Sequence, residues 1–284
     1  MRWQGGRASR NVEDRRGMRI PMGRGAGLGC GGLLLVVVIA LLTGTDPMQL
    51  LDAVGGGPSA TVSEAPRGAE GVPGDEAGEF AATILGFTEE TWNQAFARRG
   101  TEYREPTLVL FDRATPSACG FGSAAVGPFY CPADERIYLD LTFFDDLDRR
   151  FGAEGDFARA YVIAHEVGHH VQNLLGTSDH VRGLQQRASA AEANELSVRV
   201  ELQADCLAGV WGATHRDLLE PGDVEEGMGA AAAIGDDTLQ RRGGGEVQPE
   251  SWTHGSSDQR VRWLRRGLDS GDPDSCDTFA AAAL

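Results

Sequence analysis

The chain contains no lysine, and all 26 of its basic residues are arginine. Mechanisms in which a lysine forms a Schiff base or acts as an amine nucleophile are therefore excluded. Disorder over the whole chain and fibrous architectures are excluded as well, because 284 residues with 41% apolar and 24% charged content have a globular composition. No repeat of fixed period runs along the sequence.

Positive charge is scarce beyond the N-terminal region. Residues 1–45 carry seven arginines against Glu13 and Asp14, a net charge of +5, whereas residues 46–284 carry a net charge of −21. An acidic surface repels phosphate, so nucleic acid is disfavoured as a partner of the main body.

Ala26–Leu42, AGLGCGGLLLVVVIALL, is a stretch of seventeen residues without charge. As a helix it would measure roughly 26 Å, slightly less than the ~30 Å hydrocarbon core of a membrane. Arginines precede it and Asp46 and Asp52 follow it. The positive-inside rule therefore predicts a single transmembrane helix at 26–43, a basic cytoplasmic tail at 1–25 and an extracytoplasmic body. A cleaved signal peptide is the competing interpretation, although no A-x-A cleavage site follows.

Cysteine is also sparse, and the absence of a C-x2-C pair disfavours a zinc knuckle. Cys119, Cys131, Cys206 and Cys276 follow the apolar run and are even in number, as two disulfides in an oxidising compartment require. They allow three pairings. We favour Cys119–Cys131, because a Gly/Pro-rich loop separates these two, with Cys206–Cys276 joining the C-terminal tail to an interior helix. Four buried free thiols are the alternative.

The rest of the chain divides into a linker and a domain. Residues 44–78 are rich in Gly, Pro, Ala, Ser and acids, which predicts a flexible linker, and the domain occupies 79–284. A small sheet followed mostly by helices predicts an α+β fold. The predicted strands are Thr107–Phe111 and Arg136–Leu141, and the predicted helices are Thr88–Arg98, 156–175, 188–214, 223–234 and 257–268.

The string YVIAHEVGHHVQNLLG at Tyr161–Gly176 contains the pattern H-E-x-x-H. His165 and His169 are four residues apart, so on a helix both imidazoles project from one face and reach one ion. Glu166 is rotated by about 100° from His165, which places its carboxylate beside the metal as a general base. His170 falls off the shared face and is expected in solvent or in a supporting role. The pattern predicts one Zn²⁺ per chain, and buried, hydrogen-bonded histidines without a metal are the alternative.

A catalytic zinc site needs a third protein ligand. The metzincin extension is excluded, because it requires glycine where this chain has Gln172. Among Glu192, Glu195 and Glu201, only Glu201 has an aspartate four residues on, and we take it as the third ligand. That residue, Asp205, would accept a hydrogen bond from the distal nitrogen of a ligand histidine. An ordinary helix carboxylate paired with arginine is the alternative for Glu201.

Four segments together resemble the bacterial "putative neutral zinc metallopeptidase" family, a membrane-anchored group, over nearly the whole chain. They read AYVIAHEVGHHVQNLLG, RVELQADCLAGVWG, GPFYCPADERIYLDLTFF and WTHGSSDQRVRWLRRG. The resemblance implies a zincin-like α+β domain with HExxH on one helix and ExxxD on the next, similar to the thermolysin-type arrangement. It implies His165, His169 and Glu201 as zinc ligands, Glu166 as base and Asp205 in support, and it supplies no substrate.

Peptide hydrolysis also needs a group that stabilises the oxyanion. His254, in THGSSDQR, is the candidate, and a helix cap at Ser256 or Ser257 with His254 incidental is the alternative. The expected function is a zinc metalloendopeptidase that cleaves a peptide or protein substrate with zinc-activated water and Glu166 as general base, at the extracytoplasmic face of the membrane. A catalytically silent zinc-stabilised binding module and a zinc hydrolase of a non-peptide amide are the alternatives.

Overall fold

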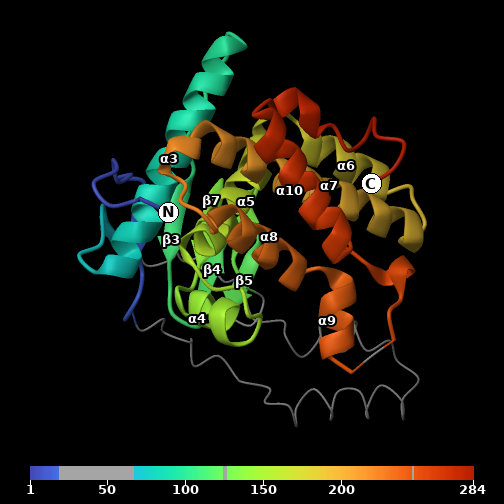
Figure 1. Ribbon diagram of the computed structural model, residues 1–284, viewed down its shortest axis with the longest axis horizontal. Coiled ribbons are helices and arrows are strands. Elements are labelled where there is room, and N and C mark those ends of the chain that lie inside the picture. The colour runs from blue at the N-terminus through green and yellow to red at the C-terminus, as the bar shows by residue number, and fades with distance from the viewer. Residues whose placement is uncertain (19–66, 124–126, 245) are drawn as a thin grey trace, which may run out of the picture. The chain divides into compact units, whose positions relative to one another are not determined.

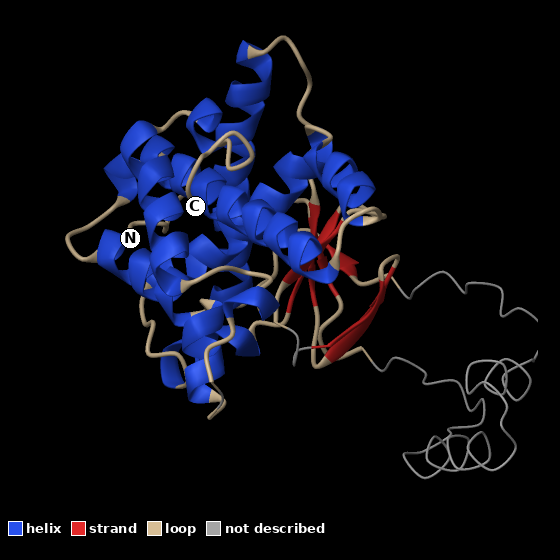
Figure 2. Cartoon of the chain, turned by 90° about the vertical axis from the view of Figure 1, so that its right-hand side faces the viewer, coloured by secondary structure: helices blue, strands red, loops and turns tan. Residues whose placement is uncertain are grey.

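The computed structural model describes residues 1–18, 67–123, 127–244 and 246–284, and the fold is α+β, as expected (Figure 1). Helices form most of the domain and the strands gather on one side of it (Figure 2). Eight α-helices lie within the described residues: α3 (Glu76–Arg98), α4 (Thr142–Arg149), α5 (Asp156–Leu174), α6 (Thr177–Gln185), α7 (Ala190–Thr214), α8 (Asp223–Ala233), α9 (Asp236–Arg242) and α10 (Ser257–Ser270).

A five-stranded mixed sheet and a two-stranded hairpin make up the β structure. The strands are β1 (Val12–Asp14), β2 (Ala69–Glu70), β3 (Thr107–Leu110), β4 (Ala114–Ser117), β5 (Gly120–Ser123), β6 (Phe129–Cys131) and β7 (Arg136–Leu139). The order in the sheet is β2-β1-β3-β7-β6, and β4 pairs with β5 in the hairpin. β1, β3 and β7 are parallel, whereas the edge strands β2 and β6 are antiparallel to their neighbours. The middle of the sheet is buried on both faces, as parallel strands usually are.

Element positions follow the sequence prediction where segments are long and periodic. The two predicted strands are β3 and β7, and the last four predicted helices are α5, α7, α8 and α10. α3 begins at Glu76 instead of Thr88, because Asp75 caps it by accepting a hydrogen bond from the Gly78 amide at 3.0 Å. The helices α4, α6 and α9 were not predicted, since about two turns contain too few residues to show a period.

Residues 1–18 belong to the folded domain, which corrects the prediction that residues 1–25 form a separate cytoplasmic tail. β1 lies between β2 and β3, and its first residue, Val12, is 1% exposed. Trp3 is buried against Phe80 of α3, with ring centroids 5.3 Å apart. Residues 1–18 and the strand β3 of the body therefore belong to one folded unit.

The predicted transmembrane helix at 26–43 lies outside the described residues, as does most of the predicted linker at 44–78. Within the residues that the structure describes, no helix combines the length and apolar character needed to cross a membrane. The described end of the linker is structured, contrary to prediction: residues 67–78 contain β2, which pairs with β1, and the first turn of α3.

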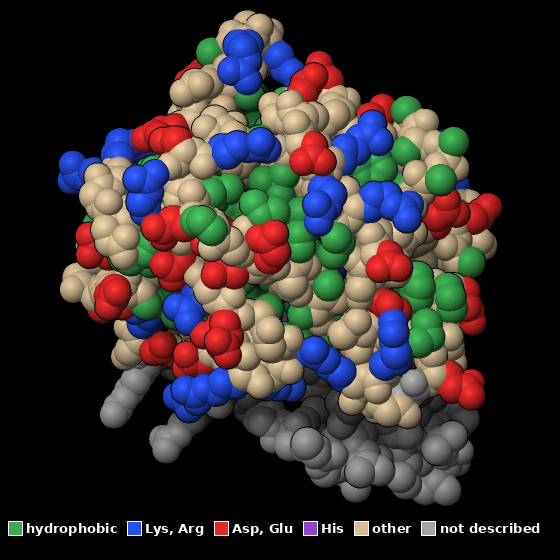
Figure 3. Space-filling view, in the orientation of Figure 1, with side chains coloured by type: hydrophobic (Ala, Val, Ile, Leu, Met, Phe, Trp, Pro, Cys, Tyr) green, Lys and Arg blue, Asp and Glu red, His purple; other side chains and the backbone are tan. Residues whose placement is uncertain are grey.

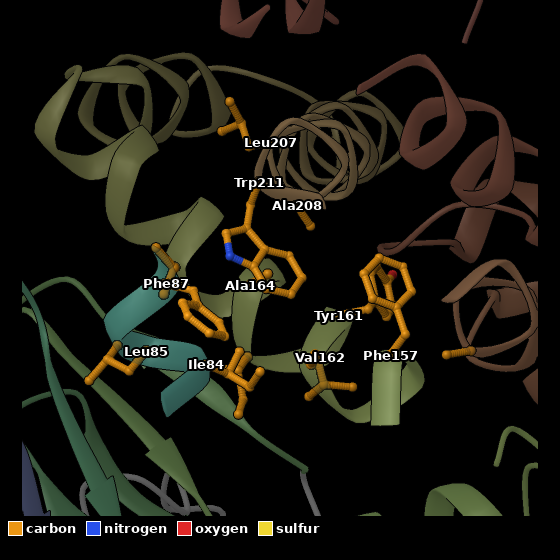
Figure 4. Close-up of a cluster of buried hydrophobic side chains, with 14 of the residues drawn as sticks. Ile84, Leu85, Phe87, Phe157, Tyr161, Val162, Ala164, Leu207, Ala208 and Trp211 are labelled. Atoms are coloured by element: carbon orange, nitrogen blue, oxygen red, sulfur yellow. The ribbon is translucent and has the colours of Figure 1, made fainter. Parts of the chain in front are cut away.

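The core lies among α3, α5, α7 and α10 (Figure 4). Trp211 of α7 stacks on Phe157 of α5, with ring centroids 5.8 Å apart, and Phe87 of α3 belongs to the same cluster. α7 and α10 approach closely because Gly267 has no Cβ, and a side chain there would collide with the Cys206 carbonyl oxygen. This packing fixes α5, α7 and α10 relative to one another, and these three helices carry the candidate site.

Both favoured disulfides, Cys119–Cys131 and Cys206–Cys276, are present. The first joins the turn of the β4–β5 hairpin to β6. The second joins α7 to the C-terminal segment across 70 residues. Closing a loop of that length stabilises a fold by roughly 4 kcal/mol in the chain-entropy account.

Charge on the surface is mixed rather than separated by sign. Figure 3 shows arginine and acidic side chains interspersed over one face, with small apolar patches between them. Several of the exposed arginines pair with acids, as Arg150 does with Asp146 at 3.3 Å. This face therefore has no basic stripe of the kind that binds nucleic acid.

Candidate metal centre

The structure brings together the three side chains expected to bind zinc. His165 and His169 project from α5 and meet Glu201 of α7. The His165 Nε2 atom lies 3.2 Å from one Glu201 oxygen, and the His169 Nε2 atom lies 3.5 Å from the other. The three ligand atoms all lie within 4.8 Å of one another. They are close enough to bind one ion.

The distal nitrogens of both histidines are hydrogen-bonded, which fixes the direction of each ring. His165 Nδ1 lies 2.8 Å from Asp205 Oδ1, the contact expected from the sequence. His169 Nδ1 lies 2.9 Å from Gln172 Oε1. The Gln172 amide nitrogen donates to the Val200 carbonyl at 2.7 Å, so its oxygen faces His169 and accepts. Each Nδ1 therefore carries a proton, and Nε2 is the atom of each ring that binds a metal after giving up any proton of its own.

Asp205 is completely buried and is held by two further donors. Arg260 of α10 donates to both carboxylate oxygens, from Nε at 2.9 Å and from its terminal nitrogen at 2.8 Å. The Tyr161 hydroxyl donates to Oδ1 at 2.6 Å. Buried charges are tolerated when they are paired and hydrogen-bonded, so Asp205 and Arg260 depend on each other. Through them, α10 supports the orientation of His165.

The charges around His165 favour a cation. Burial by itself lowers the pKa of His165, but the hydrogen bonds and charges of Asp205 and Glu201 outweigh burial and raise the pKa to about 10. Burial raises the pKa of Glu201, but the charges of His169 and His165 outweigh this effect. The pKa of Glu201 is therefore well below its ordinary value. The cluster of His165, His169 and Glu201 therefore stabilises positive charge, and a bound divalent metal would supply such a charge.

This donor set fits zinc. Two imidazoles and one carboxylate are the ligands of one class of catalytic zinc site, in which the fourth position stays open. Hydrogen bonds to the distal nitrogens are the usual support of such ligands. A closed structural site needs a fourth side chain, and no other His, Cys, Asp or Glu joins this group within the described part of the chain.

Glu166 lies next to this group without joining it. Its side chain is buried, and it lines the same cavity as His165, His169 and Glu201. Burial raises the pKa of Glu166, and the charges of His169 and His165 offset part of that rise. A raised pKa makes the carboxylate a stronger base, which is better suited to take a proton from water near neutral pH.

The cavity beside the metal group has a volume of about 690 Å³. Its lining includes the candidate ligands and Glu166 together with several aromatic and aliphatic side chains. That size is in the range of pockets that enclose small ligands or a few residues of a chain. The aromatic and aliphatic residues of the lining include Phe129, Tyr130, Phe143, Phe151, Ile234 and Leu239.

His254 lines the same cavity, just before α10. Its ring is half exposed, and Nδ1 lies 3.2 Å from Asp236 Oδ1. The backbone amide of His254 donates to the other Asp236 oxygen at 2.7 Å. The hydrogen bond with Asp236 raises the pKa of His254. Ser256 caps α10 in a capping box with Gln259, so the helix cap considered as an alternative is present as well.

Sequence reasoning missed three supporting residues. Gln172 had a usable signal, because it lies three residues after His169 on the same helix face. Arg260 and Asp236 had none: each reaches the site only through the packing of helices distant in sequence.

Asp205→Asn is expected to weaken zinc binding by about 10–100-fold. An amide accepts more weakly from His165, and it leaves Arg260 without a counter-charge. Zinc affinity would be measured by competition with a chelator, together with the melting temperature. Asp258→Asn, on an exposed position of α10, is the control and should bind zinc as the wild type does. Equal affinity in both variants would rule out the supporting role of Asp205.

Comparison with known proteins gives one family and several relatives. The sequence model of the family described as "Putative neutral zinc metallopeptidase" matches residues 1–279. "Uncharacterized protein YpfJ" of Escherichia coli (strain K12) is 50% identical over 296 residues, covering 98% of this chain and 99% of that protein. "Uncharacterized protein Rv2575" of Mycobacterium tuberculosis (strain H37Rv) is 45% identical over 195 residues, covering 64% of this chain and 65% of that protein. No solved structure matches the chain.

Proposed function

The chain belongs to the "Putative neutral zinc metallopeptidase" family, and from that membership we propose that it is a zinc-dependent peptidase with Glu166 as general base. One observation carries the proposal: Glu166 is a buried carboxylate that faces the cavity beside three candidate ligands and is not one of them. A site that only stabilises a fold has no use for such a group. This favours hydrolysis over a catalytically silent zinc module.

Each residue of the site has a separate role in the proposed hydrolysis. His165, His169 and Glu201 would hold the zinc, which when bound supplies Lewis-acid polarisation of the scissile carbonyl and of the attacking water. Glu166 takes a proton from that water and delivers it to the leaving amine nitrogen. Asp205 and Gln172 keep the two imidazoles in the orientation that ligation needs.

The edge strand β6 favours a peptide over other amides. Within the described residues β6 pairs with β7 only, and its residues Phe129 and Tyr130 line the cavity. An extended peptide can add to the open edge of a sheet through main-chain hydrogen bonds, while side-chain pockets supply selectivity. A small non-peptide amide would make no use of that edge.

The two disulfides favour an oxidising compartment for the described body. Cys119–Cys131 and Cys206–Cys276 would be reduced in most cytosols, whereas exported proteins keep such bonds. Because residues 1–18 form part of the same sheet as β3, we infer that they lie in that compartment too.

The test is incubation of the full-length, disulfide-bonded protein with an unbiased peptide library, with zinc content measured on the same sample. We expect a full complement of zinc and cleavage that a chelator stops and added zinc restores. Zinc without cleavage would favour a non-peptide amide or a silent binding module. Protein that takes up no zinc would overturn the site assignment.

His254→Ala is expected to lower kcat by about 10²-fold without loss of zinc, because it removes one donor to the developing oxyanion. Asp236 accepts a hydrogen bond from Nδ1 of His254 and raises the pKa of the ring, and the protonated imidazole has a second proton on Nε2 with which to donate. Steady-state kinetics on a cleaved library peptide would measure the change. His180→Ala, at an exposed histidine of α6, is the control and should keep full activity. A His254→Ala enzyme with wild-type kcat would exclude this role.

A further inference from the structure

We infer that Tyr130 is a positioning residue that fixes the edge strand β6 against the metal-binding helix α5 and thereby sets the width of the substrate cleft. The inference rests on the proposed peptidase function and deepens it. Tyr130 lies on β6 and lines the cavity, and its hydroxyl is bound by His170 and Asn173 of α5. Both partners follow the ligand His169 on that helix within four residues.

The hydrogen bonds around His170 have only one consistent direction. Its Nε2 lies 2.6 Å from the carbonyl oxygen of Arg104, which can only accept, so Nε2 carries a proton. In the neutral ring Nδ1 then has a lone pair and accepts from the Tyr130 hydroxyl at 3.0 Å. Asn173 Nδ2 donates to the same hydroxyl oxygen at 3.1 Å. The Tyr130 hydroxyl therefore makes its hydrogen bonds to α5, and the aromatic ring is the part of the side chain that lines the cavity.

This arrangement also corrects the sequence expectation for His170, for which solvent exposure was one of two options. The ring is completely buried, packed edge-on against Tyr130 at 5.4 Å and against Tyr103 at 5.6 Å. A polar ring in such a place must have its nitrogens satisfied. The hydrogen bonds of its ring go to Tyr130 and to the Arg104 carbonyl rather than to a candidate ligand, which points to a function in the β6 contact.

Tyr130 is the residue of β6 that can make this link, because side chains alternate along a strand. Its neighbours Phe129 and Cys131 pack in a separate cluster with Tyr138, where Phe129, which also borders the cavity, stacks on Tyr138 at 4.8 Å. β6 is only three residues long and has a single partner strand within the described residues. The pairing with β7, the Cys119–Cys131 disulfide, the stacking of Phe129 on Tyr138 and the hydrogen bonds of the Tyr130 hydroxyl hold β6 in place.

A peptide that pairs with β6 takes its position from that strand, whereas Glu166 and the metal ligands take theirs from α5 and α7. A shift of about 1 Å between reacting groups can lower a rate 10²-fold. The hydrogen bonds of Tyr130 with His170 and Asn173 connect β6, which positions the peptide, directly to α5, which carries Glu166 and two of the metal ligands. These hydrogen bonds should therefore matter most for substrates long enough to lie along β6.

The experiment compares Tyr130→Phe with the wild type on two probes: the best-cleaved ten-residue peptide of the library and a four-residue version around the same bond. We expect kcat/KM for the long peptide to fall about tenfold, while the short one changes less than twofold. Tyr138→Phe is the matched control, because it removes a hydroxyl bonded to Asp134 on the other face of the sheet. It should leave both probes unchanged.

The outcomes separate this inference from the proposed function. If the wild type cleaves both probes and Tyr130→Phe cleaves them equally well, the positioning role is wrong and the peptidase function stands. An equal loss on both probes would mean general destabilisation and would also overturn the role. Asn173→Leu, which removes one donor only, should show the same length dependence with a smaller loss. A wild type that cleaves no peptide would remove the basis of both proposals.

Discussion

Glu166→Gln is expected to lower kcat by about 10²–10⁴-fold while the protein keeps its zinc. The amide has the size of the carboxylate but cannot accept a proton from water or return one to the leaving nitrogen. Zinc should stay, because the three candidate ligand atoms belong to His165, His169 and Glu201. The measurement is single-turnover cleavage of a library peptide, with zinc determined on the same sample.

Two glutamates of α7 supply the comparison for this result. Glu201→Gln should lose zinc and activity together, because it weakens a ligand. Glu195→Gln should lose neither, because Glu195 is exposed and pairs with Arg199 at 3.0 Å on the surface of the helix. If Glu166→Gln lost zinc as Glu201→Gln does, Glu166 would be a ligand rather than a base. Full activity in Glu166→Gln would remove the general-base role.

The site was readable from the sequence where helix geometry alone determines it. The spacing of His165 and His169 places both on one face of α5, and Asp205 follows Glu201 by one turn of α7. Both pairs are therefore local facts of a helix. No local sequence pattern indicates that α5 and α7 are in contact. We inferred the contact because a catalytic zinc site requires a third protein ligand.

The N-terminal segment shows why the rest was not predictable. Arg15 and Arg16 read as part of a basic tail, but Arg15 is buried with Glu13 at 2.7 Å and Arg16 pairs with Asp75 at 2.5 Å. β1 is three residues long and pairs in parallel with β3, far along the chain. A strand that short shows no alternation, and a partner so distant in sequence leaves no local signal.

Deletion of residues 1–18 is expected to abolish folding of the domain. Without β1, the strand β2 loses its partner and β3 is left with an open edge. Loss of a buried tryptophan alone, here Trp3, destabilises a protein by about 3–5 kcal/mol. The free energy of unfolding of a typical domain is about 5–15 kcal/mol. The combined destabilisation from losing the strand, Trp3 and Val12 should therefore exceed the stability of the domain. Circular dichroism and thermal unfolding of residues 19–284 and of the full chain would measure this.

The same deletion distinguishes a structural segment from a dispensable tail. A synthetic peptide of residues 1–18 added in trans should restore a cooperative transition, because Val12–Asp14 can pair again with β3, whereas a scrambled peptide should not. Equal melting temperatures for the shortened and full chains would mean that the segment contributes nothing, and a separate tail would again be tenable. Restoration by the peptide would show that the N-terminal residues and the metal-binding body form one folded unit.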